Sequence, residues 1–217
     1  MKAFIFDLNG TMVNDMPYHT KAWRNLLNEL GGNFTIEEVK PQMYGKNQEV
    51  LARMFGAGRF TTEEMDRISI AKEKKYQQEF LPHLKLVTGL HEFLEHAFRK
   101  GIPMAIGTAA IPTNIDFVLD NLNIRHYFSA IVSADDVTFS KPNPETFLKA
   151  AELLGVPPMD CLVFEDVPKG AETAANAGMK AIIITTTHQS EEFTQFQNII
   201  HFAPDFNDEF IKTLVNF

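Results

Sequence analysis

Several features are scarce in this chain of 217 residues, and each scarcity excludes a class of protein. There is a single cysteine, Cys161, so no disulfide can form within the chain. No apolar run approaches the roughly 20 residues of a membrane span, and the first residues do not resemble a signal peptide. The net charge is −8, whereas a nucleic-acid surface needs a basic stripe. We therefore expect a protein of the reducing cytoplasm, with no nucleic-acid or membrane partner.

The remaining composition is that of a globular protein, with 45% hydrophobic and 22% charged residues. Short apolar runs occur at residues 3–6, 103–106, 130–132, 162–164 and 181–184. They are continuous rather than alternating, which is typical of strands covered on both faces. Helical patterns alternate with the last four runs, at residues 90–98, 114–122, 144–154 and 171–177. This alternation predicts an α/β fold with a doubly wound parallel sheet.

A different region, residues 15–84, interrupts the alternation and holds no strand-like run. Asp15 and Pro17 predict a helix start, with Asp15 as the N-cap. Thr61 with Glu64 has the spacing of a capping box that opens a long helix. The region is longer than a crossover needs, and it begins where it could cover the end of the first strand as a lid. We predict an α/β core domain of residues 1–14 and 85–217 and an inserted all-α cap domain of residues 15–84.

Polar residues follow four of the predicted strands. Asp7 ends the first strand, Thr108 the second, and Glu165 with Asp166 the fourth, while Lys141 lies in the segment after the third. In open parallel sheets, ligands bind beyond the carboxyl ends of the strands. The three carboxylates are suitable ligands for Mg²⁺. The hydroxyl and the ammonium could hold an anionic group against the metal.

These residues match, in order, the four motifs of the haloacid dehalogenase superfamily, which the chain resembles. The first motif is Asp-x-Asp-Gly followed by Thr or Val, and residues 7–11 match it except that Asn9 replaces the second acidic residue. The second is a Ser or Thr, here Thr108, and the third is a Lys, here Lys141. The fourth is an acidic pair before a Gly-rich turn, here residues 165–170. The resemblance implies a Rossmann-like core with a helical cap.

The resemblance also implies a nucleophile and a metal site. Asp7 would attack phosphorus and form an aspartyl-phosphate, the covalent route available to a carboxylate. Mg²⁺ would be bound by the Asp7 carboxylate, the main-chain carbonyl of Asn9 and Asp166, with help from Glu165. The expected partner is a small phosphorylated metabolite such as a sugar phosphate, and a monomer is the default expectation.

The phosphoryl group has its own expected contacts. Thr108, the adjacent Ala109 and Lys141 would bind the phosphoryl oxygens, as phosphoryl transfer requires. As an alternative, Thr108 could simply cap the helix that follows it, and it could do so while also binding phosphate.

Within the superfamily, residues 16–23 are most similar to the β-phosphoglucomutase-like phosphatases. The resemblance makes His19, Lys46 and Lys72 candidate substrate-binding residues of the cap. For His19 a solvated helix histidine is an equal alternative. For Lys72 a plain charged helix face is the alternative, because further lysines follow it. The mutases carry an Arg near Lys46 that binds a second phosphate, and no clear equivalent is found here.

Asn9 stands where the family has its general acid/base, and an amide cannot transfer the proton. Three hypotheses follow. Asn9 was engineered from Asp, or Asn9 is native and the substrate has a leaving group that needs little protonation, or the chain binds a phosphorylated ligand and turns over poorly. The expected activity is Mg²⁺-dependent phosphate hydrolysis, with β-phosphoglucomutase-type transfer as the alternative.

Overall fold

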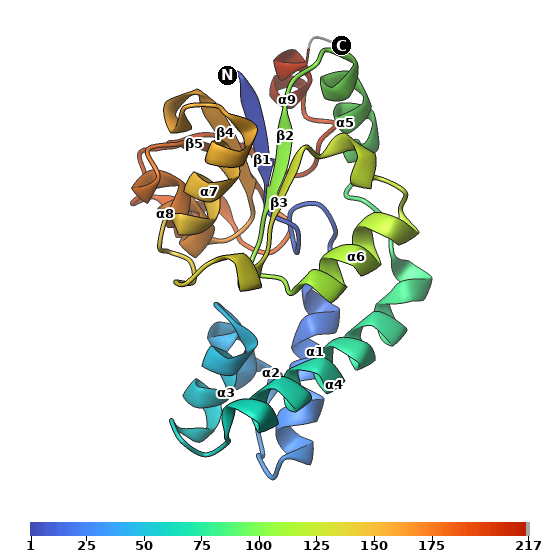
Figure 1. The fold of residues 1–217 in the computed structure, drawn as a ribbon, viewed down its shortest axis with the longest axis vertical. Coiled ribbons are helices and arrows are strands. Elements are labelled where there is room, and N and C mark those ends of the chain that lie inside the picture. The colour runs from blue at the N-terminus through green and yellow to red at the C-terminus, as the bar shows by residue number, and fades with distance from the viewer. Residues whose placement is uncertain (216–217) are drawn as a thin grey trace. The chain divides into compact units, whose positions relative to one another are not determined.

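The computed structural model describes residues 1–215, in two compact units (Figure 1). One unit, the α/β core, consists of Met1–Asn14 and Lys85–Phe217. The other, the helical unit, consists of Asp15–Leu84. Residues 216–217, the end of the predicted core domain, lie outside the described residues.

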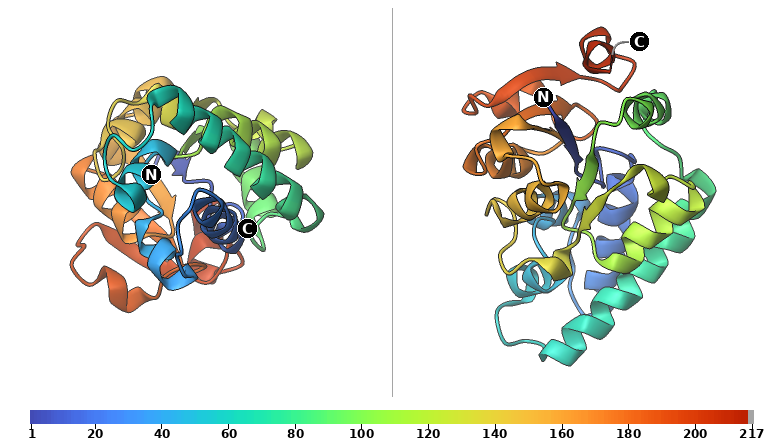
Figure 2. Two further views of the ribbon diagram at one scale, coloured as in Figure 1. Left: turned by 90° about the horizontal axis from the view of Figure 1, so that it is seen from below. Right: turned by 45° about the horizontal axis from the view of Figure 1, so that its top comes forward.

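The core is built on a six-stranded sheet in the order β3-β2-β1-β4-β5-β6, and every neighbouring pair is parallel. The predicted fold class and its five strands are confirmed. The outermost strand β6 (Figure 2, right) was not predicted, because its residues are partly exposed at the sheet edge and include a histidine. The strands are β1 (Ala3–Phe6), β2 (Met104–Gly107), β3 (Ala130–Val132), β4 (Cys161–Glu165), β5 (Lys180–Ile184) and β6 (Ile199–Ala203).

Alternate residues of β1 pack on opposite faces of the sheet, as the pleat requires. Ile5 belongs to an apolar cluster that includes Phe147 and Ala171 from helices on one face. The ring of Phe4 lies 5.2 Å from that of Phe93, from a helix on the other face. Both faces are therefore covered, which explains the continuous apolar runs. The core helices are α5 (Leu90–Arg99), α6 (Pro112–Asn121), α7 (Glu145–Leu154), α8 (Pro168–Asn176) and α9 (Glu209–Leu214), with 3-10 helices at Arg125–Tyr127, Ala134–Asp136, Pro158–Asp160 and Ser190–Phe193.

In the helical unit, the capping box at Thr61 is confirmed. Its hydroxyl accepts the N–H of Glu64 at 3.2 Å, and the Glu64 carboxylate accepts the N–H of Thr61 at 2.8 Å. Asp15 is the N-cap residue of α1 and Pro17 lies in its first turn, as predicted, but the Asp15 carboxylate makes no capping hydrogen bond and accepts the Tyr76 hydroxyl at 2.5 Å. The helices are α1 (Met16–Glu29), α2 (Ile36–Val39), α3 (Asn47–Phe55) and α4 (Thr62–Phe80), with 3-10 helices at Lys40–Gln42 and Leu81–His83.

The two ends of the insertion are anchored at one place on the core. Val13 pairs with Leu86 in an antiparallel bridge, and the N–H of Val87 donates to the carbonyl of Met12 at 2.8 Å. The chain thus leaves and re-enters the core just beyond β1. Among residues 1–215, no helix combines the length and the hydropathy that crossing a membrane would take.

Candidate active site

The candidate site begins where β1 ends, at Asp7. The N–H of Asp7 donates to the carbonyl of Phe164 at 2.9 Å, which extends the pairing of β1 with β4 by one residue. In this strand order, the chain continues from β1 toward β2 and from β4 toward β5, in opposite directions along the sheet. Such a switch point is where open parallel sheets bind ligands. Asp7 is delivered to it with 7% of its surface exposed.

Lys141 joins the first and fourth motifs. Its ammonium donates to Oδ1 of Asp7 at 2.7 Å and to Oε1 of Glu165 at 2.6 Å. All three side chains are buried. Asp7 and Glu165 therefore bond the same ammonium group, although they are 134 and 24 positions from Lys141 along the chain.

The acidic pair is held by main-chain and side-chain donors. Oε2 of Glu165 accepts the N–H groups of Asp166 at 2.8 Å and of Val167 at 3.1 Å. Oδ1 of Asp166 accepts the hydroxyl of Thr11 at 3.0 Å, and its Oδ2 accepts the hydroxyl of Thr187. Both carboxylates therefore have fixed orientations.

Two glycines make room for these carboxylates. Gly10 has a φ of +88°, and a Cβ there would lie 2.1 Å from Oδ2 of Asp166. A Cβ on Gly170 would lie 1.9 Å from Oε1 of Glu165. A glycine is therefore required at both positions for the acidic pair to lie where it does.

The pKa values of Lys141 and Asp166 are both raised above their ordinary values, for different reasons. Burial alone would lower the pKa of Lys141, but the carboxylates of Asp7 and Glu165 outweigh it and raise the pKa above its usual range. Burial, and then the charges of Glu165 and Asp7, raise the pKa of Asp166 well above the ordinary value. Lys141 is thus held as an ammonium, while the carboxylate form of Asp166 lacks a compensating cation.

The donor set fits a hard divalent cation. Oxygens of Asp7, Glu165 and Asp166 lie within 4.8 Å of one another, and all three residues are buried. Together with Lys141 they leave an excess of negative charge that one Mg²⁺ would balance. Carboxylate oxygens are the ligands Mg²⁺ prefers.

The other core residues predicted for the site lie at the same edge of the sheet. Thr108 directly follows β2, is 1% exposed, and accepts the N–H of Ala110 at 3.1 Å. It makes no capping bond to α6, whose N-cap is Ile111, so the capping interpretation was wrong. Ala109 is exposed beside it, and Asn9 is half-buried just beyond Asp7.

In the helical unit, two of the three predicted cap residues meet. Nδ1 of His19 lies 2.6 Å from Nζ of Lys72, and the His19 ring stacks on Tyr76 at 3.7 Å. Lys72 also donates to both oxygens of Glu73, at 3.0 and 3.1 Å. His19 is 7% exposed and Lys72 is 2% exposed. The alternatives of a solvated histidine and a charged surface lysine were therefore wrong.

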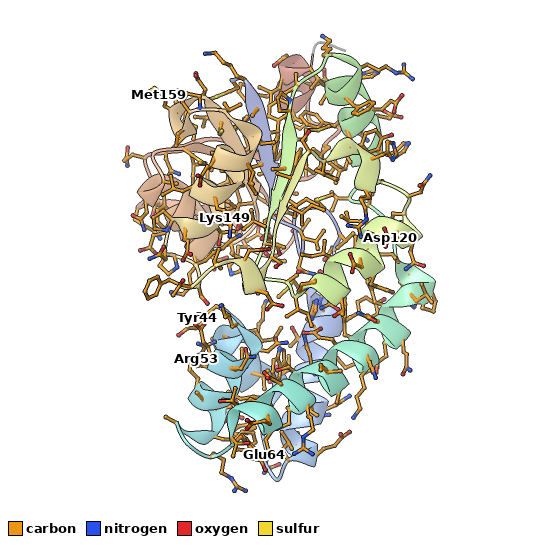
Figure 3. The ribbon with its side chains drawn as sticks, viewed as in Figure 1. Tyr44, Arg53, Glu64, Asp120, Lys149 and Met159 are labelled. Atoms are coloured by element: carbon orange, nitrogen blue, oxygen red, sulfur yellow. The ribbon has the colours of Figure 1, made fainter. Side chains whose placement is uncertain are left out.

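Lys46 lies in a loop that its neighbours hold in place. Asn47 donates to Oε1 of Glu73 at 2.8 Å, which ties the start of α3 to the His19 and Lys72 cluster. Arg53 donates to the main-chain carbonyls of Gln42, at 2.7 Å, and of Tyr44, and its guanidinium lies 3.7 Å from the centre of the Tyr44 ring (Figure 3). The loop is thus fixed at both ends within the helical unit.

Sequence reasoning missed two threonines that touch the core site. Thr187 donates to Asp166, and Thr186 donates to the main-chain carbonyl of Gly10. Both follow β5 at the carboxyl edge of the sheet. The rule that selected Asp7 and Thr108, polar residues after a buried strand, points to the run of threonines 185–187 but does not indicate which of them contact the site.

Comparisons with known proteins show the family of the chain. A family model described as haloacid dehalogenase-like hydrolase matches residues 1–178. The fructose-1-phosphate phosphatase YqaB of Escherichia coli is 35% identical over 188 residues, which cover 83% of this chain and 94% of that protein. The β-phosphoglucomutase of Bacillus subtilis is 30% identical over 189 residues, covering 84% of this chain and 82% of that protein.

Solved structures share the fold over the full length. A haloacid dehalogenase hydrolase of family IA, variant 3, from Entamoeba histolytica superposes with a TM-score of 0.86 at 26% identity, covering 100% of this chain and 98% of the other. A β-phosphoglucomutase from Clostridium difficile superposes with a TM-score of 0.83 at 25% identity, covering 100% and 97%. The chain therefore belongs to the haloacid dehalogenase-like hydrolases and is an enzyme of their β-phosphoglucomutase-like branch.

Proposed function

We propose that this enzyme is a Mg²⁺-dependent phosphohydrolase that acts on a small sugar phosphate through an aspartyl-phosphate. The observation that carries the proposal is the convergence of Asp7, Lys141, Glu165 and Asp166 at the switch point of the sheet. A buried carboxylate beside a buried ammonium and two further acidic groups combines a nucleophile, a charge-neutralising cation and a metal site. These are the parts that phosphoryl transfer needs.

In the proposed reaction, an oxygen of Asp7 forms a bond to phosphorus while the bond from phosphorus to the sugar oxygen breaks. Water then cleaves the aspartyl-phosphate, which releases inorganic phosphate and restores Asp7. Lys141 and Thr108 hold the phosphoryl oxygens, and Lys141 also neutralises charge at the Asp7 carboxylate. Asp7, Asp166 and the Asn9 carbonyl, with Glu165, would hold Mg²⁺, which supplies further stabilisation of the transferring charge.

The substrate class rests on the relatives and on the helical unit. The Escherichia coli relative is named as a fructose-1-phosphate phosphatase. We propose that the helical unit serves as the cap and that its His19, Lys46 and Lys72 contact the substrate. Their nitrogen atoms would serve as hydrogen-bonding groups for the oxygens of a phosphorylated sugar.

The amide of Asn9 lowers the rate of hydrolysis that we expect for sugar phosphates. General acid–base catalysis contributes roughly 10²–10⁴-fold, and an amide supplies none of it. We therefore expect slow hydrolysis of sugar phosphates, faster hydrolysis of substrates with good leaving groups such as acyl phosphates, and a gain of about 10²–10⁴-fold on sugar phosphates in Asn9→Asp.

A phosphate-release screen with Mg²⁺ over sugar phosphates, acyl phosphates and pyrophosphate tests the proposal on this chain and on Asn9→Asp. If Asn9→Asp is inactive on every substrate, the proposed activity is wrong and a phospho-ligand-binding protein is favoured. If this chain is already as fast as Asn9→Asp, position 9 does not transfer the proton. Asp7→Asn is the control that should lose all turnover.

A second candidate function is phosphoryl transfer between positions of one sugar. The 30% identity to the Bacillus subtilis β-phosphoglucomutase favours it. The test is conversion of β-glucose 1-phosphate to glucose 6-phosphate by Asn9→Asp, followed with a coupled assay. Phosphate release without that conversion decides for the hydrolase.

A further inference from the structure

Asp166 receives two side-chain hydrogen bonds, one on each carboxylate oxygen. Thr11, from the first motif, donates to Oδ1 at 3.0 Å, and Thr187, from the far end of β5, donates to Oδ2. The hydroxyl of Thr187 also lies 3.1 Å from the main-chain carbonyl of Asp166. A carboxylate held at both oxygens by residues from the loops after β1 and β5 cannot rotate freely, and each oxygen keeps a further lone pair.

The Thr187 hydroxyl also contacts the side chain of His188. Nδ1 of His188 lies 2.9 Å from the Thr187 hydroxyl. When the single proton of that hydroxyl is directed to Asp166, the hydroxyl oxygen is left to accept a hydrogen bond from Nδ1 of His188. The His188 ring lies edge-on to Phe193, at 6.3 Å between centroids, and Phe193 is 1% exposed. A chain of directed hydrogen bonds therefore runs from His188 through Thr187 to Asp166.

The neighbouring threonines show that this contact is specific. Thr186 donates to the main-chain carbonyl of Gly10, in the loop that carries Thr11, so the segment is tied to the site at a second point. Thr185 donates instead to the carbonyl of Ala203 on β6, at 3.3 Å, and is a matched reference for the same residue type. Three consecutive threonines thus have three different partners.

We propose that Thr187, supported by His188, is a positioning residue that fixes the Asp166 carboxylate as a Mg²⁺ ligand. The inference rests on the proposed function in that Asp166 is taken to bind the metal. Groups behind a metal ligand orient it, and their loss weakens metal affinity by about 10- to 100-fold. Thr187 would act through Asp166 alone and would not contact the substrate.

Calorimetric titration of Mg²⁺ into the metal-free full chain tests the inference. Thr187→Val, which keeps the shape and removes the donor, is expected to weaken Mg²⁺ affinity by about 10- to 100-fold, and Thr187→Ser to recover most of it. Thr185→Val is the control and should match the parent. Thermal unfolding in EDTA shows whether each variant is folded, and Thr187→Ala is the substitute if Thr187→Val is not.

Equal Mg²⁺ affinity of Thr187→Val, or Thr187→Ala, and the parent would overturn the inference, as would a parent that binds no Mg²⁺. His188→Phe, which keeps the ring against Phe193 and removes the donor, should give a smaller weakening. Measurement of phosphate release distinguishes a failure of the proposed function from a failure of the role assigned to Thr187. If the parent binds Mg²⁺ and Asn9→Asp hydrolyses nothing, the proposed function fails while the order of Mg²⁺ affinities still decides the role of Thr187.

Discussion

The two units of this enzyme each bury one lysine among carboxylates, and the two lysines differ. In the core, Lys141 donates to Asp7 and to Glu165, at 2.7 and 2.6 Å. In the helical unit, Lys72 donates to Glu73 and faces a ring nitrogen of His19. Burial lowers the pKa of both ammonium groups, but two bonded carboxylates raise that of Lys141 above its usual range. The pKa of Lys72 stays lowered, although Glu73 and Asp15 oppose burial.

The two lysines differ in the number of carboxylates bonded to them, and this difference matches the opposite directions in which their pKa values are shifted. Burial is similar, at 9% exposure for Lys141 and 2% for Lys72. Lys141 has two direct carboxylate partners and Lys72 has one. A buried charge is stable only when its partners replace the lost hydration. The ammonium form is therefore favoured at Lys141 in the core, whereas burial disfavours it at Lys72 in the helical unit.

The largest expected effect comes from breaking the core cluster. In EDTA, Lys141→Met should lower the free energy of unfolding by about 3–5 kcal/mol, because it leaves buried carboxylates without their cation. Mg²⁺ should recover part of this loss, since it would replace the missing charge. Urea denaturation with and without Mg²⁺ measures both. Lys149→Met, at a partly exposed residue that donates to the main-chain carbonyl of Asp136 (2.7 Å), is the control and should change stability by less than about 0.5 kcal/mol.

A smaller loss is expected from crowding the same cluster. A Cβ in Gly170→Ala would meet the Glu165 carboxylate at 1.9 Å, so the variant should lose about 1–3 kcal/mol of unfolding free energy. Glu172→Ala, on the same helix, is the comparison and should be nearly neutral. Full stability of Gly170→Ala would show that the core carboxylates move aside easily and are not fixed.

The ion pair of Lys72 and Glu73 in the helical unit should tolerate replacement by uncharged residues better than the ion pairs of Lys141 in the core. Lys72→Met combined with Glu73→Gln removes both charges and keeps an acceptor for Asn47. Its unfolding free energy should stay within about 1 kcal/mol of the parent or rise, because replacing a complete buried ion pair is often neutral or stabilising. Urea denaturation checks this. A loss as large as that of Lys141→Met would mean that the two clusters are equivalent.

The smallest effect is a difference in pH dependence. Because the folded pKa of Lys72 lies below 10.5, the unfolded chain binds more protons there, and stability rises with pH between the lowered pKa and 10.5. Lys141 has the opposite sign: its stabilisation is complete below 10.5 and is lost as pH rises through its raised folded pKa. Below 10.5, Lys72→Met should therefore flatten the rise of unfolding free energy with pH.

Denaturation in EDTA at stepped pH values measures that slope for the parent and for Lys72→Met. Lys74→Met, at an exposed position of the same helix, is the control and should keep the parent's slope. An identical slope in Lys72→Met would indicate that Lys72 is fully charged in the folded protein and that the contrast between the two lysines is wrong.

Much of the core site could be predicted from the sequence, because its residues follow buried strands directly. Asp7 and Thr108 directly follow an apolar run, and Glu165 ends one. Each run is continuous rather than alternating, which indicates a strand covered on both faces. Thr187 lies just beyond β5 and was missed, because the sequence does not indicate which of three consecutive threonines contacts Asp166. Only the partners distinguish them.

The helical unit was harder to predict. Lys72, Lys74 and Lys75 are close together on α4, and the sequence favoured a charged surface for all of them. Packing of α4 against α1 buries Lys72 against His19 and leaves Lys74 exposed. Helical period alone could place these residues on faces, but which face meets α1 depends on the neighbouring helix.

The sequence by itself indicated five of the strands, the capping box at Thr61, the four motifs and the position of Asn9 in the first of them. Local propensity and residue type suffice for these, because each depends on neighbours in the chain. The tertiary structure alone decided the charge of Lys141 and Lys72, the opposed donors on Asp166 and the sixth strand. Those properties depend on desolvation and on distances between residues far apart in sequence, which no local pattern encodes.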